Sequence, residues 1–222
     1  MATNASFPPY EFKDGDAIVG IDAEIAAKIA EKLGKTLEIV DTEFGSIIGG
    51  VQTGKFDIGM AGMTVTEERL KSINFSNSYA KGVQSIIVPE GSEYASLDDF
   101  YNEDGTVKDG VMIGVQQDTT GDIYTTDDFG ADKVVRFKTG NDAIQALVSG
   151  KVTAVIIDNE PAKSYVASNT GLQILSTPYT EEDYAIAVAK ENTELLDGIN
   201  KALAELTADG TIQQILDKYI AA

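Results

Sequence analysis

Apolar runs alternate with segments of helical periodicity from the start of the chain. Residues 17–21 (AIVGI) form an apolar run that predicts a strand, and Asp22 is then expected to cap a helix that Gly34 ends. Apolar residues recur at every fourth position of that helix, and residues 37–40 predict the next strand. A strand, a helix and a parallel strand form one βαβ unit with a right-handed crossover. The pattern therefore predicts an α/β protein.

The same pattern occurs twice along the chain. Residues 51–60 (VQTGKFDIGM) and 147–156 (LVSGKVTAVI) both contain a helix end, a Gly-Lys pair and an apolar run that predicts a buried strand. This faint internal repeat predicts two similar α/β units. Residues 46–53 predict a short helix that contains Gly49 and Gly50, each of which costs about 1 kcal/mol relative to Ala in a helix interior. Either that helix is short or a neighbouring group needs close approach to its backbone.

Periodicity and turn residues locate the remaining elements. Asn141 is expected to cap one of the helices, and Pro161 suits the first turn of another. The expected strands are residues 83–88, 111–115, 134–137, 152–157, 172–175 and 184–189. The expected helices are residues 142–149, 161–169, 194–209 and 212–220, together with one that runs from Thr119 or Thr120 to Phe129.

The chemistry of the chain changes abruptly within residues 57–74 (DIGMAGMTVTEERLKSIN). After the apolar run, Thr64 and Glu67 make the spacing of a capped helix start, and Arg69 falls in the first turns of that helix. A guanidinium at a strand end and a helix start can hold a carboxylate with two parallel hydrogen bonds. The alternative is a surface arginine paired with Glu67 or Glu68.

Two further positions carry candidate binding chemistry in the second half of the chain. Thr119 or Thr120 would cap a helix whose first N–H groups form a ready anion site, although an ordinary capped helix is equally compatible. Asp158 ends a predicted strand, where open α/β sheets bind ligands, although it could also be a helix cap. Arg69 and Asp158 together would suit the carboxylate and the ammonium of a zwitterion, such as a free amino acid.

Composition and charge exclude several classes of function. The chain of 222 residues has no cysteine and no histidine, which excludes disulfides, Cys/His metal sites and Ser-His-Asp or Cys-His catalysis. Its formal net charge of −19 repels phosphate backbones and anionic membranes, so we expect no nucleic-acid partner. No apolar run is long enough to span a membrane. The first residues lack the features of a secretion signal, so we expect that a leader has been removed.

The sequence resembles the polar amino-acid-binding proteins of ABC importers, the class that contains the glutamine-, histidine- and lysine/arginine/ornithine-binding proteins. The resemblance covers nearly the whole chain and is specific only when its motifs are taken together. The motifs are FPPYEF (7–12), VGIDAEIAAKIAEKLG (19–34), AGMTVTEERLKSINFSNSY (61–79), GVQQDTTGD (114–122), VIIDNEPA (155–162) and ADGTIQQILDKY (208–219). It implies a two-lobed periplasmic-binding-protein-like fold of type II, in which each lobe is a mixed sheet flanked by helices. Residues 1–87 and 184–222 would form lobe 1, residues 88–183 would form lobe 2, and two hinge strands would join them.

The resemblance also implies the role of each site residue. The ligand carboxylate would be bound by Arg69, Thr64, Thr119 and Thr120, and the ammonium would be bound by Asp158 and the Gly62 carbonyl. The side-chain pocket would be lined by Asn4, Phe7, Phe44, Ala61, Gln84, Gln116 and Asp118. No metal, cofactor or catalytic residue is implied.

Departures from the family pattern bear on the ligand. Asn4 stands where relatives that select cationic side chains often have Asp, and Asp118 stands where Gly is usual. Gly49-Gly50 replaces a Pro-small pair. Because Asn4, Gln84 and Gln116 can hydrogen-bond an amide or a hydroxyl, these residues favour a neutral polar amino acid such as glutamine.

The expected mechanism is hinge closure over the ligand by a monomer outside the cytoplasm, in the periplasm or lipid-anchored at the cell surface. The closed form would deliver the amino acid to a membrane permease. Two alternatives share this scaffold. One is an enzyme of the cyclohexadienyl dehydratase type, for which the sequence shows no clearly placed general acid. The other is a ligand-sensing domain or a biosensor derivative.

Overall fold

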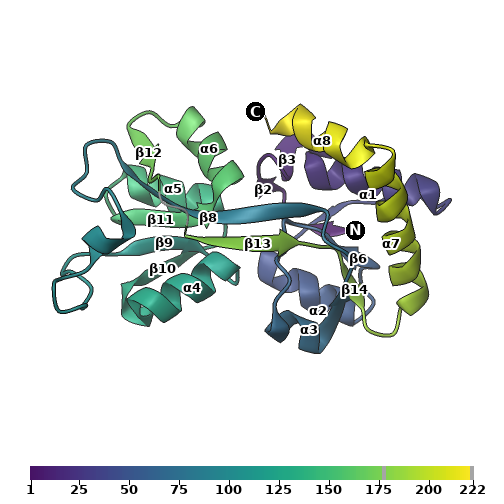
Figure 1. Ribbon diagram of the computed structural model, residues 1–222, viewed down its shortest axis with the longest axis horizontal. Coiled ribbons are helices and arrows are strands. Elements are labelled where there is room, and N and C mark those ends of the chain that lie inside the picture. The colour runs from purple at the N-terminus through teal and green to yellow at the C-terminus, as the bar shows by residue number, and fades with distance from the viewer. Residues whose placement is uncertain (177–178, 221–222) are drawn as a thin grey trace. The chain divides into compact units, whose positions relative to one another are not determined.

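The computed structural model describes residues 1–176 and 179–220. The chain divides into two compact units, each with its own sheet (Figure 1). Unit 1 consists of Met1–Lys81 and Glu182–Ala222, and unit 2 consists of Gly82–Glu181. The prediction of two α/β units therefore agrees with this division.

Unit 1 contains a five-stranded mixed sheet in the order β5-β1-β6-β14-β7. Its strands are β1 (Ala2–Thr3), β5 (Val40–Asp41), β6 (Ile58–Gly59), β7 (Ile73–Phe75) and β14 (Ala187–Ala189). Strand β1 runs parallel to β5 and β6, whereas β14 runs antiparallel to β6 and β7. Strands from both ends of the chain thus build one core, in which Ile47, Met63 and Ile73 are fully buried.

A separate three-stranded antiparallel sheet corrects the predicted βαβ unit. It contains β2 (Ser6–Phe7), β3 (Glu11–Asp14) and β4 (Ala17–Val19). Strand β4 pairs with β3, and β5 pairs with β1, so the two predicted strands do not share a sheet. The parallel partner of β5 is β1, which precedes this inserted sheet in the chain. The prediction that residues 17–21 form the parallel partner is therefore wrong.

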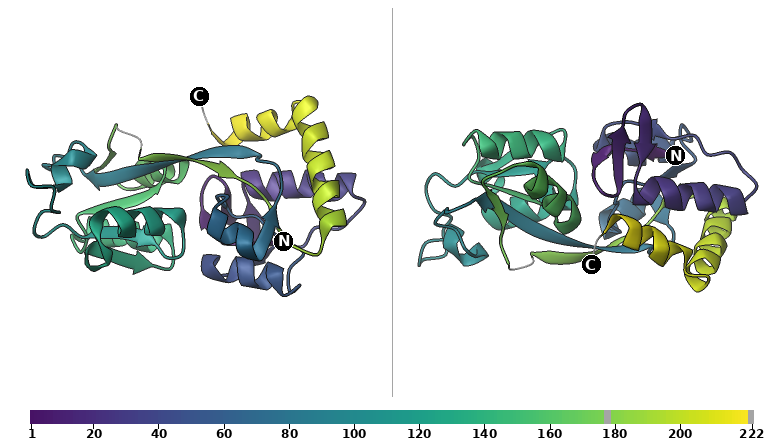
Figure 2. Two further views of the ribbon diagram at one scale, coloured as in Figure 1. Left: turned by 60° about the horizontal axis from the view of Figure 1, so that its bottom comes forward. Right: turned by 90° about the horizontal axis from the view of Figure 1, so that it is seen from above.

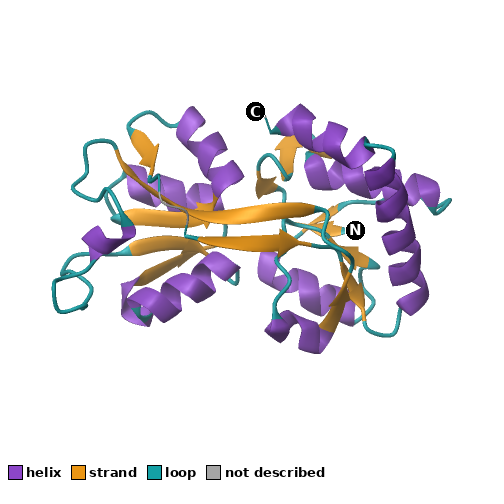
Figure 3. Cartoon of the chain, viewed as in Figure 1, coloured by secondary structure: helices purple, strands orange, loops and turns teal. Residues whose placement is uncertain are grey.

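Two groups of helices pack in unit 1. Helices α1 (Ile21–Lys32), α7 (Thr193–Ala208) and α8 (Thr211–Tyr219) contact one another, whereas α2 (Ile47–Gln52) and α3 (Glu67–Ser72) form a second group (Figure 3). A 3-10 turn, η1 (Phe44–Ser46), precedes α2. Two predicted caps are wrong: α1 begins after Gly20 rather than Asp22, and α3 begins after Thr66 rather than Thr64.

Unit 2 contains a mixed sheet in the order β10-β9-β11-β8-β12. Its strands are β8 (Ala80–Pro89), β9 (Ile113–Gln116), β10 (Val134–Phe137), β11 (Ala154–Asp158) and β12 (Leu172–Ile174), with β13 (Thr180–Tyr184) beside β8. Strands β9 and β11 are parallel and buried along their whole length, which is why their residues form nearly continuous apolar runs.

The helices of unit 2 pack on this sheet (Figure 1). They are α4 (Thr120–Phe129), α5 (Gly140–Val148) and α6 (Asn159–Ser168), and η2 (Leu97–Phe100) and η3 (Ala131–Lys133) are short 3-10 turns. The predicted cap Thr119 is confirmed for α4, because its side chain accepts a hydrogen bond from Asp122 N. The predicted cap Asn141 is wrong, since Thr139 fills that role for α5.

Strands β8 and β13 carry the chain from one unit to the other and run side by side in both views of Figure 2. The crossings fall between residues 81 and 82 and between residues 181 and 182. The expected boundaries, after residue 87 and before residue 184, differ because most of β8 pairs with β11 and β12 of unit 2. The expected lobes also included residues 177–178 and 221–222, which lie outside the described residues. Within the described residues, no helix is long and apolar enough to cross a membrane.

Candidate functional site

The predicted site residues fall into two sets, one in each unit. Unit 1 holds Asn4, Phe7, Phe44, Ala61, Gly62, Thr64 and Arg69, and unit 2 holds Gln84, Gln116, Asp118, Thr119, Thr120 and Asp158. Each set is described by itself below, starting from the element that positions it.

Arg69 is held at the start of α3 by three interactions. Its backbone N–H donates to Thr66 Oγ1 at 3.1 Å, which is the cap of the helix. Its Nη1 donates to the Thr64 carbonyl oxygen at 2.8 Å, and its guanidinium carbon lies 5.3 Å from the centre of the Phe44 ring. The residue is only 8% exposed, which differs from the alternative of a solvated surface arginine. These contacts fix the direction of the guanidinium and place it beside the Phe44 ring.

Thr64 occupies a bridge rather than the helix cap that its spacing with Glu67 suggested. It forms an isolated antiparallel bridge with Tyr184, and it is buried. The chain is held on both sides of it, because Ala185 N donates to Met63 O at 3.0 Å and Val65 N donates to Asp183 O at 3.1 Å. The helix cap lies two residues later than the sequence predicted, because Thr64 and Thr66 both have a hydroxyl that could cap the helix. Thr66 is the cap, whereas Thr64 pairs with Tyr184.

Gly62 and Phe7 lie in contact. Gly62 has a φ of +52°, and a Cβ at this position would lie 2.9 Å from Phe7 Cε1. Both the left-handed backbone and the close ring therefore require glycine here. Ala61 beside it is buried as well. The turn after β6 thus consists of small, buried residues, and its exposure of backbone to a ligand stays a prediction.

The Asn4 amide makes hydrogen bonds through both its nitrogen and its oxygen. Its Nδ2 donates to the Thr42 carbonyl at 2.8 Å, and its Oδ1 accepts from Ser6 Oγ at 2.9 Å. The first bond ties the end of β1 to the segment after β5, and the second is local. A role for Asn4 in a ligand pocket remains a prediction.

In unit 2, Asp158 and Gln84 are opposite each other on neighbouring strands. They pair in register across β11 and β8, and Gln84 Nε2 donates to Asp158 Oδ2 at 2.9 Å. Both side chains are buried. Asp158 stands at the N-cap position of α6 but makes no side-chain capping bond. Its carboxylate is therefore oriented by Gln84 rather than used to cap the helix.

The loop between β9 and α4 brings Gln116, Thr119 and Thr120 together. Thr119 Oγ1 donates to the Gln116 carbonyl at 2.8 Å and accepts from Asp122 N at 3.3 Å. Gln116 and Thr120 are both about as buried as core residues, at 3% exposure each. This arrangement holds the first turn of α4, which favours negative charge at its N-terminus.

Asp118 lies in the same loop with a left-handed backbone, at a φ of 66°. Its N–H donates to Asp122 Oδ2 at 3.2 Å, and Arg136 Nε lies 2.9 Å from Asp122 Oδ1. Arg136 also donates to Thr126 Oγ1 at 2.7 Å. The second arginine of the chain therefore braces the loop through Asp122.

The structure also reveals a buried acidic cluster that the sequence analysis missed. Asp22 is fully buried, and its Oδ2 accepts a hydrogen bond of 2.8 Å from Gly62 N. Burial raises the pKa of Asp22 to about 6, while the Gly62 N–H and the neighbouring Tyr79 hydroxyl and Glu11 carboxyl limit that rise. Burial, with Asp22 and Glu11 nearby, also raises the pKa of Tyr79 well above its usual value.

A sequence signal for this cluster existed. Asp22 lies on the same helical face as Ile25, Ala26 and Ile29, all of which are buried. The sequence interpretation treated Asp22 as a helix cap, although its helical spacing to these residues indicates the buried face.

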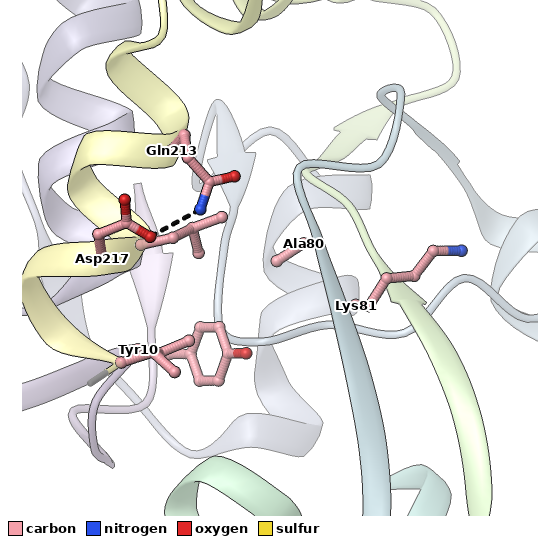
Figure 4. A pocket seen from close by; sticks show the side chains of 7 residues that line it. Tyr10, Ala80, Lys81, Gln213 and Asp217 are labelled. Carbon is pink, nitrogen blue, oxygen red and sulfur yellow. Dashed lines mark hydrogen bonds between the residues drawn. The ribbon is translucent and has the colours of Figure 1, made fainter. Parts of the chain in front are cut away.

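A pocket of about 210 Å³ in unit 1 lies apart from the predicted set. It opens between Tyr10, the start of β8 and α8, where Gln213 Nε2 donates to Asp217 Oδ1 at 2.7 Å (Figure 4). None of the predicted site residues lines it. The described part of the chain also holds no group of three or more acidic side chains that could bind a metal ion.

Comparisons with known proteins find similar sequences and similar solved structures that match nearly the whole chain. Arginine-binding extracellular protein ArtP of Bacillus subtilis (strain 168) is 32% identical over 99% of this chain and 84% of its own length. A solved ancestral arginine-binding protein bound to glutamine is 40% identical, with a TM-score of 0.91 over 100% of this chain and 96% of its own. The arginine-bound form of truncated ArgBP from T. maritima is also 40% identical, with a TM-score of 0.84 over 92% of this chain and 94% of its own.

The structural neighbours have the two-lobed fold of type II periplasmic binding proteins, as the resemblance implied. The family description that matches residues 1–222 concerns proteins that bind solutes rather than enzymes. The chain belongs to the bacterial extracellular solute-binding proteins, family 3.

Proposed function

We propose that this solute-binding protein binds a free L-amino acid and delivers it to the membrane permease of an ABC transporter. The observation that carries the proposal is the separation of opposite charges. A buried guanidinium, Arg69, belongs to unit 1, and a buried carboxylate, Asp158, belongs to unit 2. A zwitterion offers one pole to each, and burial of both poles is tolerable only when both are neutralised.

Each pole would be held by more than one group. The ligand carboxylate would be bound by Arg69 and Thr64 together with Thr119 and Thr120 at the start of α4. The ammonium would be bound by Asp158 and the Gly62 carbonyl. The side chain would contact Asn4, Phe7, Phe44, Ala61, Gln84, Gln116 and Asp118.

Binding would be coupled to closure of the two units over the ligand. The chain crosses between them only in β8 and β13 within the described residues, and a two-strand connection suits a hinge. Closure is favoured only if both units contact one ligand, because a ligand shifts an equilibrium by its differential affinity for the two states. We propose that the closed monomer, in the periplasm or anchored at the cell surface, is the form that meets the permease.

Arginine and glutamine are the first two ligands to test. The names of the similar proteins favour arginine, because ArtP and ArgBP are arginine-binding proteins. The amides of Asn4, Gln84 and Gln116 favour a neutral polar side chain such as that of glutamine. Both are compatible with the neighbour that was solved as an arginine-binding protein bound to glutamine.

A thermal-shift screen against the twenty amino acids tests the proposal. A ligand present at 100 times its dissociation constant should raise the unfolding free energy by about 2.7 kcal/mol, which shifts the melting temperature clearly. We expect arginine, glutamine or both to give the largest shift. Absence of a shift with every amino acid would refute the proposed ligand class.

The role of Arg69 is tested with the ligand from that screen. Arg69→Ala should weaken binding by several kcal/mol, since it leaves a buried carboxylate without its partner. Lys71→Ala removes an exposed positive charge from the same helix and should leave the affinity unchanged. Near-native affinity of the Arg69 variant in calorimetry would remove Arg69 from the site.

A further inference from the structure

The Asp22 side chain accepts a hydrogen bond from the predicted ammonium-binding turn. It lies in the first turn of α1, and Asp22 N donates to the Tyr10 carbonyl at 2.9 Å, while Ile21 N donates to the Pro9 carbonyl at 3.1 Å. These bonds tie the helix start to the segment between β2 and β3. The carboxylate then bonds to Gly62 N at 2.8 Å, across 40 residues of sequence.

This bond acts on a part of the backbone that requires glycine. Gly62 has a left-handed conformation, and the Phe7 ring blocks any larger residue. A fixed acceptor for its N–H holds the Ala61–Gly62 peptide in place, and this restricts the next peptide, which carries the Gly62 carbonyl. The carbonyl is the group proposed above to receive the ligand ammonium, so this inference rests on the proposed function.

The charge of Asp22 adds a second effect. Asp22 is 0% exposed and the neighbouring Tyr10 is 1% exposed, so little water screens the carboxylate. The titratable groups that face it are Glu11 on β3 and Tyr79 ahead of β8, and Tyr10 lies next to Tyr79. None of these groups supplies a positive charge. A ligand ammonium would be a cation one peptide unit away from this carboxylate.

We propose that Asp22 is a positioning residue for the ligand ammonium, which it favours both by fixing the Gly62 peptide and by placing a buried negative charge behind it. The ligand then stabilises the ionised form of Asp22. Because the carboxyl is protonated in part near pH 6 in the free protein, ligand binding in that range releases a proton.

The sign of the pH dependence follows from this linkage. Above pH 7 the carboxyl is already ionised, and binding releases no proton from it. Below pH 6 binding must first ionise Asp22, so the affinity falls as the pH is lowered. We expect a loss of affinity of up to about tenfold between pH 7 and pH 5, because the ionised fraction of a carboxyl with a pKa of about 6 falls by about that factor over this range.

The test uses calorimetry at pH 5, 6 and 7 with L-arginine and L-glutamine, in buffers of different ionisation enthalpy to count the released protons. Wild type should release a fraction of a proton near pH 6. Asp22→Asn keeps an oxygen that can accept from Gly62 N but removes the charge. This variant should bind about tenfold more weakly at pH 7 and show a weaker dependence on pH through this range than wild type.

Two comparisons separate positioning from a general structural role. Glu31→Gln, on the exposed part of α1, makes the same charge change and should behave as wild type. 5-Guanidinopentanoate, which is arginine without its α-ammonium, should bind wild type and Asp22→Asn with equal affinity. Asp22→Ala, which also removes the acceptor for Gly62, should bind the amino acid more weakly than Asp22→Asn.

The outcomes distinguish this inference from the proposed function. If wild type binds an amino acid but Asp22→Asn has the same affinity and pH profile, the positioning role is refuted and the proposed function stands. Equal losses for the amino acid and for 5-guanidinopentanoate would likewise refute it, because the effect would not depend on the ammonium. If wild type binds no amino acid, the proposed function and this inference both fail.

Discussion

The Gln84 amide donates a hydrogen bond of 2.9 Å to the Asp158 carboxylate, between two buried residues in register on antiparallel strands. The pair joins two segments that are 74 residues apart in the chain. It holds the carboxylate of unit 2 in one orientation and leaves its charge intact, because a neutral amide is the donor. A pre-oriented carboxylate binds a cation with less loss of side-chain freedom.

Gln84→Met should therefore weaken amino-acid binding by about 1 to 2 kcal/mol, since methionine has a similar length but cannot donate to Asp158. Calorimetry with the ligand found in the screen measures the effect. Gln145→Met, an exposed change on α5 of the same unit, is the matched control. Unchanged affinity in the Gln84 variant would show that Asp158 does not depend on this bond.

Asp22 should also make the stability of the protein depend on pH. Its folded-state pKa of about 6 lies above the usual value of about 3.9 for an unfolded chain, so the native state binds the proton more tightly. This contribution to stability is complete below about pH 4 and is lost as the pH rises through 6. Relative to Asp22→Asn, wild type should thus lose about 2 to 3 kcal/mol between pH 4 and pH 7.

Urea unfolding of both proteins at several pH values checks this difference, with no ligand present. Comparing wild type with Asp22→Asn cancels the general effect of the large net negative charge on the unfolding free energy, because the two proteins differ by only one charge. A difference in unfolding free energy that does not vary with pH would contradict the raised pKa.

Gly49 and Gly50, both in the short helix α2, should respond in opposite directions to alanine. A Cβ on Gly50 would lie 2.5 Å from Phe56 Cδ2, whereas a Cβ on Gly49 meets nothing within 4 Å. Gly50→Ala should lower the unfolding free energy by about 1 to 3 kcal/mol through overpacking. Gly49→Ala should raise it by about 0.4 to 1 kcal/mol by restricting the unfolded chain. Thermal and denaturant unfolding measure both, and equal effects would contradict the close approach of Phe56.

Asp118 should tolerate glycine better than alanine. Its φ of 66° is unfavourable for a residue with a Cβ, although an Asp side chain can make local hydrogen bonds such as that from Gln117 Nε2 at 3.3 Å. Asp118→Gly should be more stable than Asp118→Ala by about 1 kcal/mol. Chemical denaturation of the two variants gives this difference directly. If alanine were the more stable, the backbone would not be left-handed in solution.

Much of the local structure could be predicted from the pattern alone. The strand at residues 134–137 and the Thr119 cap of α4 agree with the prediction, because a short run rich in apolar residues and a threonine before a helix are local signals. The alternatives offered for Gly49 and Gly50 are both correct, as α2 is short and Phe56 approaches Gly50 closely. Local signals were wrong where two residues offered the same chemistry, as with Thr64 and Thr66.

The sequence by itself determined the class of chemistry: an acidic α/β chain without cysteine or histidine, with one arginine beside a strand end and family motifs along its whole length. Tertiary structure alone decided which groups meet. It buried Asp22 against Gly62, placed Gln84 opposite Asp158 and assigned Arg136 to brace a loop. The physical reason is that periodicity specifies which face of an element is buried, whereas the partner on that face comes from a distant segment that no local pattern encodes.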